Sequence, residues 1–328
     1  MTTISVVIPA YNAESTILST VDSVRQQTFT DIEIIVIDDG SSDRTLDLLE
    51  TVRDKRLQVY PYGNSGVSIA RNRGIAHSLG QYISFIDADD LWTKDKLEKQ
   101  LAVLQANPQA GVVYSWVTLM LEAKNLSETT TFVSGSKATF TGDILSELLL
   151  ENFIVNGSNV MIKREVIESV GEFDPHLKTC EDWEYYLRLA AKYHFALVPE
   201  QQIIYRKAPG SLSSKTSAME QEGLKAIDKI YRIIPRQLQE RKNKSIAKFS
   251  IYCGKIYLDR NNLKISDRDV REATKRFWKA IYLDPSLLLM KDIYIFLVKI
   301  LFKQLLPHQL SDRLISTIRK PLSIKHLR

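Results

Sequence analysis

Apolar residues in the first part of the chain alternate between two spacings. Nearly continuous apolar runs rich in β-branched residues are typical of buried strands, and they predict strands at residues 4–9, 32–37, 57–60 and from residue 82. Between these runs the spacing is helical, which predicts helices at residues 14–27, from about 44, at 66–79 and at 94–106. Four such repeats indicate an α/β fold whose doubly wound, mostly parallel sheet carries helices on both faces.

The pattern changes in the second part of the chain. It predicts strands at residues 110–121, 160–162, 196–198 and 203–206, and helices at 144–151, at 164–170 and from about 181. The polar residues 122–131 are expected to form a loop, and the spacing is helical throughout from residue 216 onward. The 328 residues therefore divide into an α/β domain, residues 1–215, and an all-α C-terminal domain, residues 216–328.

Three carboxylates follow directly after the strand that begins at residue 82. Ligands bind beyond the carboxyl ends of the strands in an open parallel sheet, so Asp87, Asp89 and Asp90 lie where a site is expected. Asp87 and Asp89 could share Mg²⁺ or Mn²⁺, hard cations that prefer oxygen ligands and leave positions for substrate phosphate. The alternative is a capped turn before a helix, because Asp is favoured in turns and at N-caps.

Polar side chains also stand at the ends of the neighbouring predicted elements. Tyr11 could stack on a nucleobase or pack as an ordinary strand-end residue, and Asp39 could accept a hydrogen bond from a base or ribose. Arg71 or Arg73 could hold a diphosphate, although arginines on a helix more often form a solvated face.

A second acidic pair, Glu181 and Asp182, begins a predicted helix that also carries Trp183 and Tyr186. The acids could simply stabilise the helix through its dipole, or Asp182 could act as a general base with the two aromatic residues walling the acceptor side. We expect the dipole to keep the pKa of Asp182 low, so that its carboxylate is ionised at neutral pH. The Gly/Ser/Pro-rich residues 207–214 could move as a lid, and residues 156–159 are a candidate acceptor segment.

Composition and charge narrow the classes of function. The net charge of +5 combines −8 for residues 1–215 with +13 for residues 216–328, and a basic half of this kind suits an anionic surface. Two cysteines and an N-terminus without a secretory signal suit the cytoplasm. Because no GxGxxG or GxxxxGK[ST] loop follows the first strand, neither a dinucleotide-dependent dehydrogenase nor a P-loop NTPase is expected.

Six motifs, in their order and spacing, resemble glycosyltransferase family 2, which comprises inverting enzymes of the GT-A fold: VVIPAYNAE, VIDDGSSDRT, SIARNRG, FIDADD, GEFD and CEDWEYYLRLA. The resemblance covers about residues 1–215. It implies a nucleotide pocket in which Tyr11 stacks on the base and Asp39 hydrogen-bonds it. The residues that it assigns to this pocket are Pro9, Tyr11, Asn12, Glu14 and Asp39.

The same resemblance implies roles for the acidic residues. It makes Asp87 and Asp89 a DxD motif, with Asp89 as the metal ligand and Asp87 near the ribose, and it makes Asp182 the catalytic base. It also places Arg71 and the loop of Arg206 near the diphosphate. The QxxRW motif and transmembrane helices of the family's processive synthases are not found, so transfer of a single sugar is expected.

The C-terminal domain weakly resembles one tetratricopeptide-like unit. The residues that carry this likeness are Gly254, Tyr257, Ala273, Phe277, Ala280 and Pro285. Residues 287–306 are mostly apolar, and Asp292, Lys299 and Lys303 fall on one narrow helical stripe. The charges argue against a membrane span, which leaves an interfacial helix or a packed core helix as the alternatives.

We therefore expect a metal-dependent enzyme, cytoplasmic and at the inner face of a membrane, that moves one sugar from a nucleotide diphosphosugar, UDP being favoured, to a glycan or lipid-linked acceptor. Peripheral contact with an anionic membrane is expected, nucleic acid is not, and a homo-oligomer is compatible with the sequence. A nucleotidyltransferase is one alternative, but it would need a Gly-rich basic loop after the first strand. The other is a catalytically inert nucleotide-sugar-binding scaffold that acts through its C-terminal helices; Asp39, Asp87, Asp89 and Asp182 argue against it.

Overall fold

The computed structural model describes residues 2–121, 130–207, 216–258, 265–306, 310, 311 and 314. These residues form two compact units. The first contains the described residues up to 148 and those from 152 to 207, and the second contains residues 149–151 and those from 216 onward. The expected boundary between residues 215 and 216 adjoins a segment outside the described part and stays a prediction.

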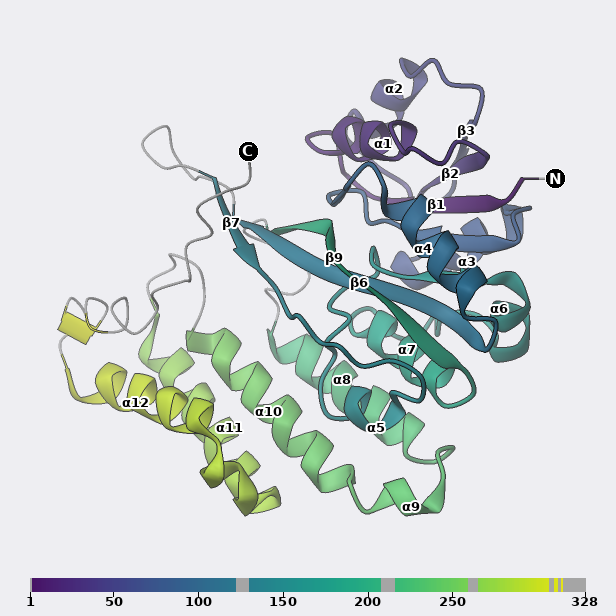
Figure 1. Ribbon diagram of the computed structural model, residues 1–328. Helices are drawn as coiled ribbons and strands as arrows, with labels where there is room; N and C mark the ends of the chain where they lie inside the picture. Colours follow the sequence, from purple (N-terminus) through teal and green to yellow (C-terminus); the bar gives the residue numbers. More distant parts are fainter. Residues whose placement is uncertain are drawn as a thin grey trace. The chain divides into compact units, whose positions relative to one another are not determined.

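One half of the sheet in the first unit is parallel (Figure 1). Its strands lie in the order β3-β2-β1-β4 and comprise β1 (Ile4–Ala10), β2 (Ile32–Asp38), β3 (Leu57–Pro61) and β4 (Tyr82–Phe85). The chain runs from β1 outward through β2 to β3 and then returns to β4 on the other side of β1. This reversal creates a switch point at the carboxyl ends of β1 and β4, where the connecting loops diverge and leave room for a ligand.

The other half of the sheet is mixed. An antiparallel strand, β8 (Met161–Lys163), joins β4 to β6 (Ala110–Leu121), and β9 (His194–Lys207) runs parallel to β6. Two short strands pair antiparallel with these, β5 (Leu91–Trp92) with β9 and β7 (Thr131–Ser134) with β6. The expected α/β class with a mostly parallel sheet is confirmed, but β5 and β7 were not predicted. Thr131, expected at the end of a loop, begins β7, and residues 122–129 of that loop lie outside the described residues. The two predicted closing strands form one strand, β9, whose register shifts between Ser115 and Val117 of β6.

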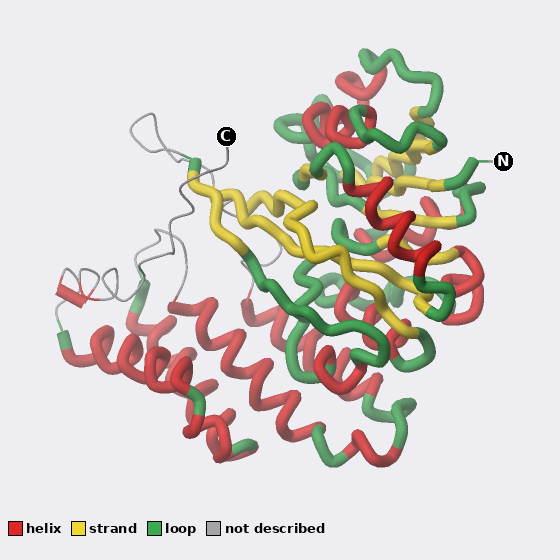
Figure 2. Tube along the Cα trace, in the orientation of Figure 1, coloured by secondary structure: helices red, strands yellow, loops and turns green. Residues whose placement is uncertain are grey.

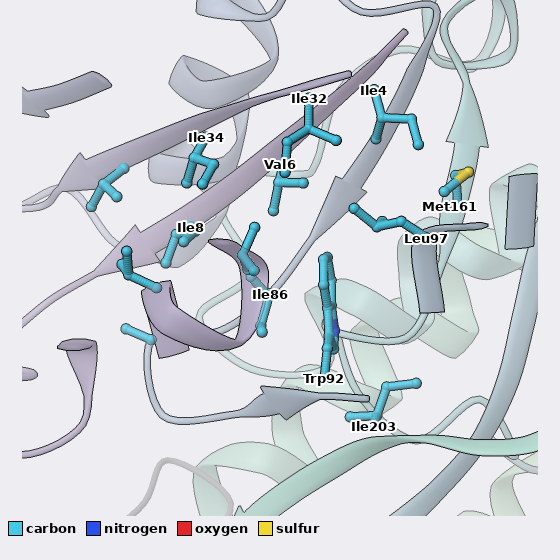
Figure 3. Packing of buried hydrophobic residues seen from close by; sticks show 14 of the residues in the cluster. Ile4, Val6, Ile8, Ile32, Ile34, Ile86, Trp92, Leu97, Met161 and Ile203 are labelled. Atoms are coloured by element: carbon cyan, nitrogen blue, oxygen red, sulfur yellow. The ribbon is translucent and has the colours of Figure 1, made fainter. Parts of the chain in front are cut away.

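Helices cover both faces of the sheet (Figure 2). Alternate residues of β2 point to opposite faces, so Ile34 joins the large core with α1 (Ile17–Arg25) and α4 (Lys96–Ala106), whereas Ile35 packs against Ala70 of α3 (Val67–His77). Figure 3 shows the large core, to which β1, β2 and α4 contribute residues together with Trp92 of β5. The remaining helices of this unit are α2 (Thr45–Glu50), α5 (Leu145–Leu148), α6 (Arg164–Val170) and α7 (Glu181–Ala190).

Among the described residues of the second unit from 216 onward, all regular secondary structure is helical. The helices are α8 (Thr216–Ile230), α9 (Arg236–Gln239), α10 (Lys242–Leu258), α11 (Asp267–Leu283), the 3₁₀ helix η2 (Pro285–Leu289) and α12 (Lys291–Leu305). Gly254 lets α10 approach α12 closely, because a Cβ there would meet the Phe296 ring at 2.8 Å. Tyr257 and Phe277 lie in the same core, but the tetratricopeptide-like interpretation stays a prediction.

The three charges expected on one stripe of α12 differ in exposure. Asp292 is exposed and Lys299 half-buried, while Lys303 is buried in the unit. The stripe of charges therefore runs from the solvent-exposed start of α12 to its packed side. A different face of the helix, which carries Tyr294, Leu301 and Leu305, is exposed to solvent. Among the helices of the described residues, none combines the length and the apolar character that a bilayer crossing requires.

Candidate active site

The loops after β1 and β2 interlock at the carboxyl edge of the sheet. Asn12, which has a positive φ of 48°, donates its backbone N–H to Ser41 Oγ at 2.9 Å and accepts at Oδ1 from the Ser42 N–H at 2.8 Å. Glu14 Oε2 accepts from the Arg44 N–H at 3.1 Å. Asn12 and Glu14 thus fix the shape of the two loops, while the ring of Tyr11 is exposed beside them.

Asp39 is buried at the end of β2 and already has partners within the chain. Its carboxylate accepts hydrogen bonds from the N–H groups of Ser65 at 2.9 Å and Gly66 at 2.7 Å, where α3 begins, and forms an ion pair with Arg73 at 3.3 Å. Pro9 is buried within β1 next to these loops. The predicted base contacts of Asp39 and Tyr11 stay predictions; the structure shows an exposed ring and a firmly held carboxylate.

The acidic loop after β4 presents two of its three carboxylates at the edge of the sheet. Asp87 and Asp89 are partly exposed, and Asp87 Oδ1 accepts from Arg71 Nη2 at 2.6 Å. Arg206, near the end of β9, donates from Nε to the backbone carbonyl of Asp89 at 2.9 Å, so the arginine expected near the diphosphate does lie against this loop. The proposed lid at residues 207–214 is almost entirely outside the described residues.

Asp90, the third acid of the loop, is fully buried and anchors it. It accepts hydrogen bonds from Ser158 Oγ at 2.5 Å, Asn156 Nδ2 at 2.7 Å and the Arg206 N–H at 3.1 Å. Burial is the largest cause that raises the pKa of the Asp90 carboxyl well above its ordinary value, and the charges of Asp89 and Asp87 raise it further. Ser158 Oγ also accepts the Asp87 N–H at 2.9 Å, so one buried hydroxyl connects both ends of the loop.

The side chain of Arg71 joins the acidic loop to α7. It is only 2% exposed, and its two terminal nitrogens contact Asp87 at 2.6 Å and Glu181 Oε1 at 2.7 Å. The guanidinium lies 5.3 Å from the ring centroid of Phe173. Burial alone would lower the pKa of Arg71, but the carboxylates of Asp87, Glu181 and Asp182 outweigh burial and raise it above its ordinary value. The cation is therefore permanently charged and holds two elements together.

Asp182 stands in the first turn of α7, and its protonation differs from the expectation. Burial of its carboxyl and the neighbouring charge of Glu181 raise the pKa of Asp182 to about 7, although Arg71 lowers it. The expected low pKa is thus wrong. The helix dipole contributes only about 0.3 to 1 kcal/mol, less than one pKa unit, whereas burial can shift a carboxyl by up to ~3 to 5 units. A pKa near neutrality is well matched to general-base chemistry at physiological pH.

The aromatic residues of α7 have structural contacts. Trp183 is buried and donates from its indole Nε1 to the Leu148 carbonyl at 2.9 Å, and Tyr186 donates from its hydroxyl to the Asn156 carbonyl at 2.9 Å. The candidate acceptor segment, residues 156–159, is also buried. Within it, Asn159 forms hydrogen bonds with backbone groups of Ser115 and Ile154. These side chains fix the position of α7 beside the acidic loop, and their suggested acceptor role stays a prediction.

The donor atoms at the edge of the sheet fit Mg²⁺ or Mn²⁺. Asp87 and Asp89 supply hard carboxylate oxygens, and no group of three or more His, Cys, Asp or Glu side chains suited to a metal occurs among the described residues. Magnesium commonly binds one or two carboxylates and completes its shell with water and substrate phosphates. The acidic loop suits such a shared site better than a closed protein cage.

The sequence matches a known family model over most of its length. The model, described as Glycosyltransferase like family 2, matches residues 5–254. The chain belongs to this family. It is 33% identical over 216 residues to a Bacillus subtilis (strain 168) protein named as a teichuronic acid biosynthesis glycosyltransferase, TuaG; the match covers 64% of this chain and 81% of TuaG. The family expected from the six motifs is confirmed.

Solved structures show the same fold in other proteins. S. aureus TarS 1–349 in complex with UDP-GlcNAc has a TM-score of 0.61 and 18% identity, over 86% of this chain and 81% of that one. The mannosyltransferase PcManGT from Pyrobaculum calidifontis, in complex with GDP-Man and Mn²⁺, has a TM-score of 0.59 and 17% identity, over 97% of this chain and 87% of that one. This similarity confirms a GT-A-like fold for the glycosyltransferase family 2 chain.

The anchoring roles of Asp90, Asn156 and Ser158 were not predicted from the sequence, which indicated residues 156–159 only as a candidate acceptor segment. Asp90 follows the DxD motif directly, and that position was its only signal. Asn156 and Ser158 could not be connected to it, because their partners lie 66 and 68 residues away in the chain. Phe173 lies in the GEFD motif, which the family resemblance already included.

We predict that Arg71→Met destabilises the protein by about 3 to 5 kcal/mol, because it leaves two carboxylates in a buried region without their cation. Equilibrium urea unfolding measures this loss. Lys99→Met is the matched control, since Lys99 also contacts two carboxylates, Asp95 at 2.7 Å and Glu200 at 2.5 Å, but on the exposed surface. The control should unfold close to the wild-type midpoint. Equal midpoints for the two variants would contradict the structural role of Arg71.

Proposed function

We propose that this chain transfers a single sugar, with inversion at the anomeric carbon, from a UDP-sugar to a hydroxyl acceptor in the synthesis of a cell-envelope polysaccharide or related glycan. The observation that carries the proposal is the contact of one buried guanidinium with both acidic sites: Arg71 binds Asp87 of the DxD motif and Glu181, the neighbour of Asp182. This contact keeps metal-binding oxygens and a candidate base at the same end of the sheet, as displacement of a diphosphate requires.

The relatives support the donor and the product class. TuaG is named for teichuronic acid biosynthesis, the TarS complex contains UDP-GlcNAc, and the PcManGT complex contains GDP-Man with Mn²⁺. The two complexes fit a nucleotide-sugar donor, and the TuaG name fits a polysaccharide product. We favour UDP, and we infer that the exposed ring of Tyr11 stacks on the base while the loops fixed by Asn12 and Glu14 shape the pocket around it.

A divalent metal is part of the proposal. Asp89 would be its direct ligand, and Asp87, tied to Arg71, would remain near the ribose and diphosphate. The ion, when bound, neutralises charge on the departing diphosphate. Arg206, which already lies against the backbone of Asp89, is positioned to add positive charge at the same place.

Asp182 is the proposed general base. The acceptor hydroxyl oxygen forms a bond to the anomeric carbon on the face opposite the diphosphate, the bond from that carbon to the diphosphate oxygen breaks, and the hydroxyl proton passes to Asp182. Its raised pKa of about 7 keeps a substantial ionised fraction at neutral pH and makes the carboxylate a better proton acceptor than an ordinary aspartate. Glu181 is the second candidate, but its carboxylate is engaged by Arg71.

We predict that Asp89→Ala weakens UDP binding in the presence of Mn²⁺ by at least ~10-fold, or about 1.4 kcal/mol, because the metal loses its carboxylate. The backbone carbonyl that Arg206 contacts is retained. Isothermal titration with UDP, with and without chelator, measures the change. Asp22→Ala removes a surface carboxylate paired with Arg25 and should bind as wild type. A variant at Asp89 with wild-type affinity and wild-type chelator sensitivity would refute the metal assignment.

We predict that Asp182→Asn binds UDP with near wild-type affinity but transfers sugar at least ~100-fold more slowly, because positioned general-base assistance contributes ~10² to 10⁴ in rate. The donor half-reaction, hydrolysis of the UDP-sugar by water, measures the rate without a known acceptor. The pH dependence adds a second readout. Since the pKa of Asp182 is raised to about 7, the wild-type rate should rise with pH up to about 7 and then level off, and this rise should be absent in the variant.

Asp47→Asn is the matched control for this experiment, because Asp47 is an exposed acid in the first turn of α2. It should leave binding, rate and pH profile unchanged. Near-normal turnover in Asp182→Asn would exclude Asp182 as the base, whereas loss of UDP binding would show that the residue is a structural cap. Absence of donor hydrolysis in the wild type, together with intact UDP binding, would favour the inert scaffold.

A further inference from the structure

The outward faces of α11 and α12 carry large apolar side chains that the core of the second unit leaves uncovered. On α11 these are Trp278 and Tyr282, the latter 86% exposed, and on α12 they are Tyr294, Leu301 and Leu305, the last 75% exposed. We call these five residues the α11–α12 face. The opposite side of each helix is packed, through Phe277 of α11 and Phe296 of α12 among others. Both helices thus carry apolar residues on two sides, only one of which faces the core.

The five residues flank a single seam between the helices. Gln304 Nε2 donates to Thr274 Oγ1 at 3.0 Å, which brings the end of α12 beside the middle of α11. On α11, Trp278 lies one turn after Thr274, and on α12, Leu301 lies about one turn before Gln304. Both side chains therefore lie next to this contact between the helices, on its outer side. Ile281 and Leu297 pack against the core beneath them. The aromatic and aliphatic side chains therefore form one surface of the unit.

Exposed cations accompany this surface. On α11, Lys275 lies one turn and Arg271 two turns before Trp278 on the same stripe, and Lys291 begins α12. Lys275 also pairs with Glu272 at 3.0 Å on the surface. The chain from residue 216 onward has a net charge of +13. Apolar and cationic groups thus meet on the same side of the two helices.

This combination fits an anionic lipid bilayer better than a protein partner. Trp and Tyr favour the membrane–water interface, and each Lys or Arg near an anionic leaflet contributes about 1 kcal/mol. Protein interfaces, in contrast, are depleted in Lys relative to the rest of the surface. We propose that the α11–α12 face docks on anionic membranes, with its aromatic and leucine side chains at the headgroup level and its cations against the lipid phosphates. The proposal goes beyond the transfer reaction and does not depend on it.

The test is co-flotation of the full chain with phosphatidylcholine vesicles that contain or lack phosphatidylglycerol. We expect flotation only with the anionic vesicles, reduced by added salt. The double variant Trp278→Ser/Tyr294→Ser should reduce partitioning at least ~10-fold. Tyr252→Ser is the matched control, because Tyr252 is an exposed tyrosine on α10 outside the face, and it should float as wild type. Equal thermal unfolding midpoints would show that the variants are folded.

Three results would overturn the proposal: no flotation with anionic vesicles at low salt, equal flotation with neutral vesicles, or unchanged flotation of the double variant. Light scattering of the lipid-free protein identifies the main competing occupant. A wild-type dimer that the double variant converts to a monomer, without flotation of either, would assign the face to a second copy of the chain instead. Because none of these readouts uses sugar transfer, failure here leaves the proposed function intact, and failure of transfer leaves the docking test valid.

Discussion

The buried guanidinium of Arg71 is the interaction on which the geometry of the site depends. Removing a cation from water costs several kcal/mol, so the fold retains it only with its carboxylates in place. These carboxylates come from distant parts of the chain, Asp87 after β4 and Glu181 at the start of α7. Gly157 adds a steric condition, because a Cβ at that position would collide with the guanidinium. The acidic loop, α3 and α7 are therefore fixed together.

In this arrangement the two acids of each acidic motif have different roles. Asp87 and Glu181 form ion pairs with Arg71, and their neighbours Asp89 and Asp182 are the residues that we propose for metal binding and proton transfer. Burial and the neighbouring charge of Glu181 raise the pKa of Asp182 to about 7, although Arg71 lowers it. The same network that stabilises the fold thus sets the protonation of the proposed base.

The sequence predicts those parts of the molecule whose signal is local. The strands of the parallel half of the sheet consist of nearly continuous apolar runs, and the motifs that contain Asp89 and Asp182 identify the family. By contrast, β5 has only two residues and shows no periodicity, and the bulges in the pairing of β6 with β9 interrupt the pattern that would mark one long strand. The burial of Arg71 could not be predicted, because an arginine on a helix usually faces solvent and its partner Glu181 lies 110 residues away.

The stereochemistry of donor hydrolysis tests the central claim most directly. In the proposed reaction the attacking oxygen and Asp182 lie on the face of the sugar opposite the diphosphate, as in inverting glycoside hydrolysis, where a carboxylate activates water from that side. Proton NMR of a UDP-α-sugar hydrolysed by the enzyme, recorded before mutarotation, reports which anomer is released first. We expect the β-anomer to be released first, because a single displacement inverts the α-configuration of the donor. Release of the α-anomer first would contradict a single displacement assisted by Asp182.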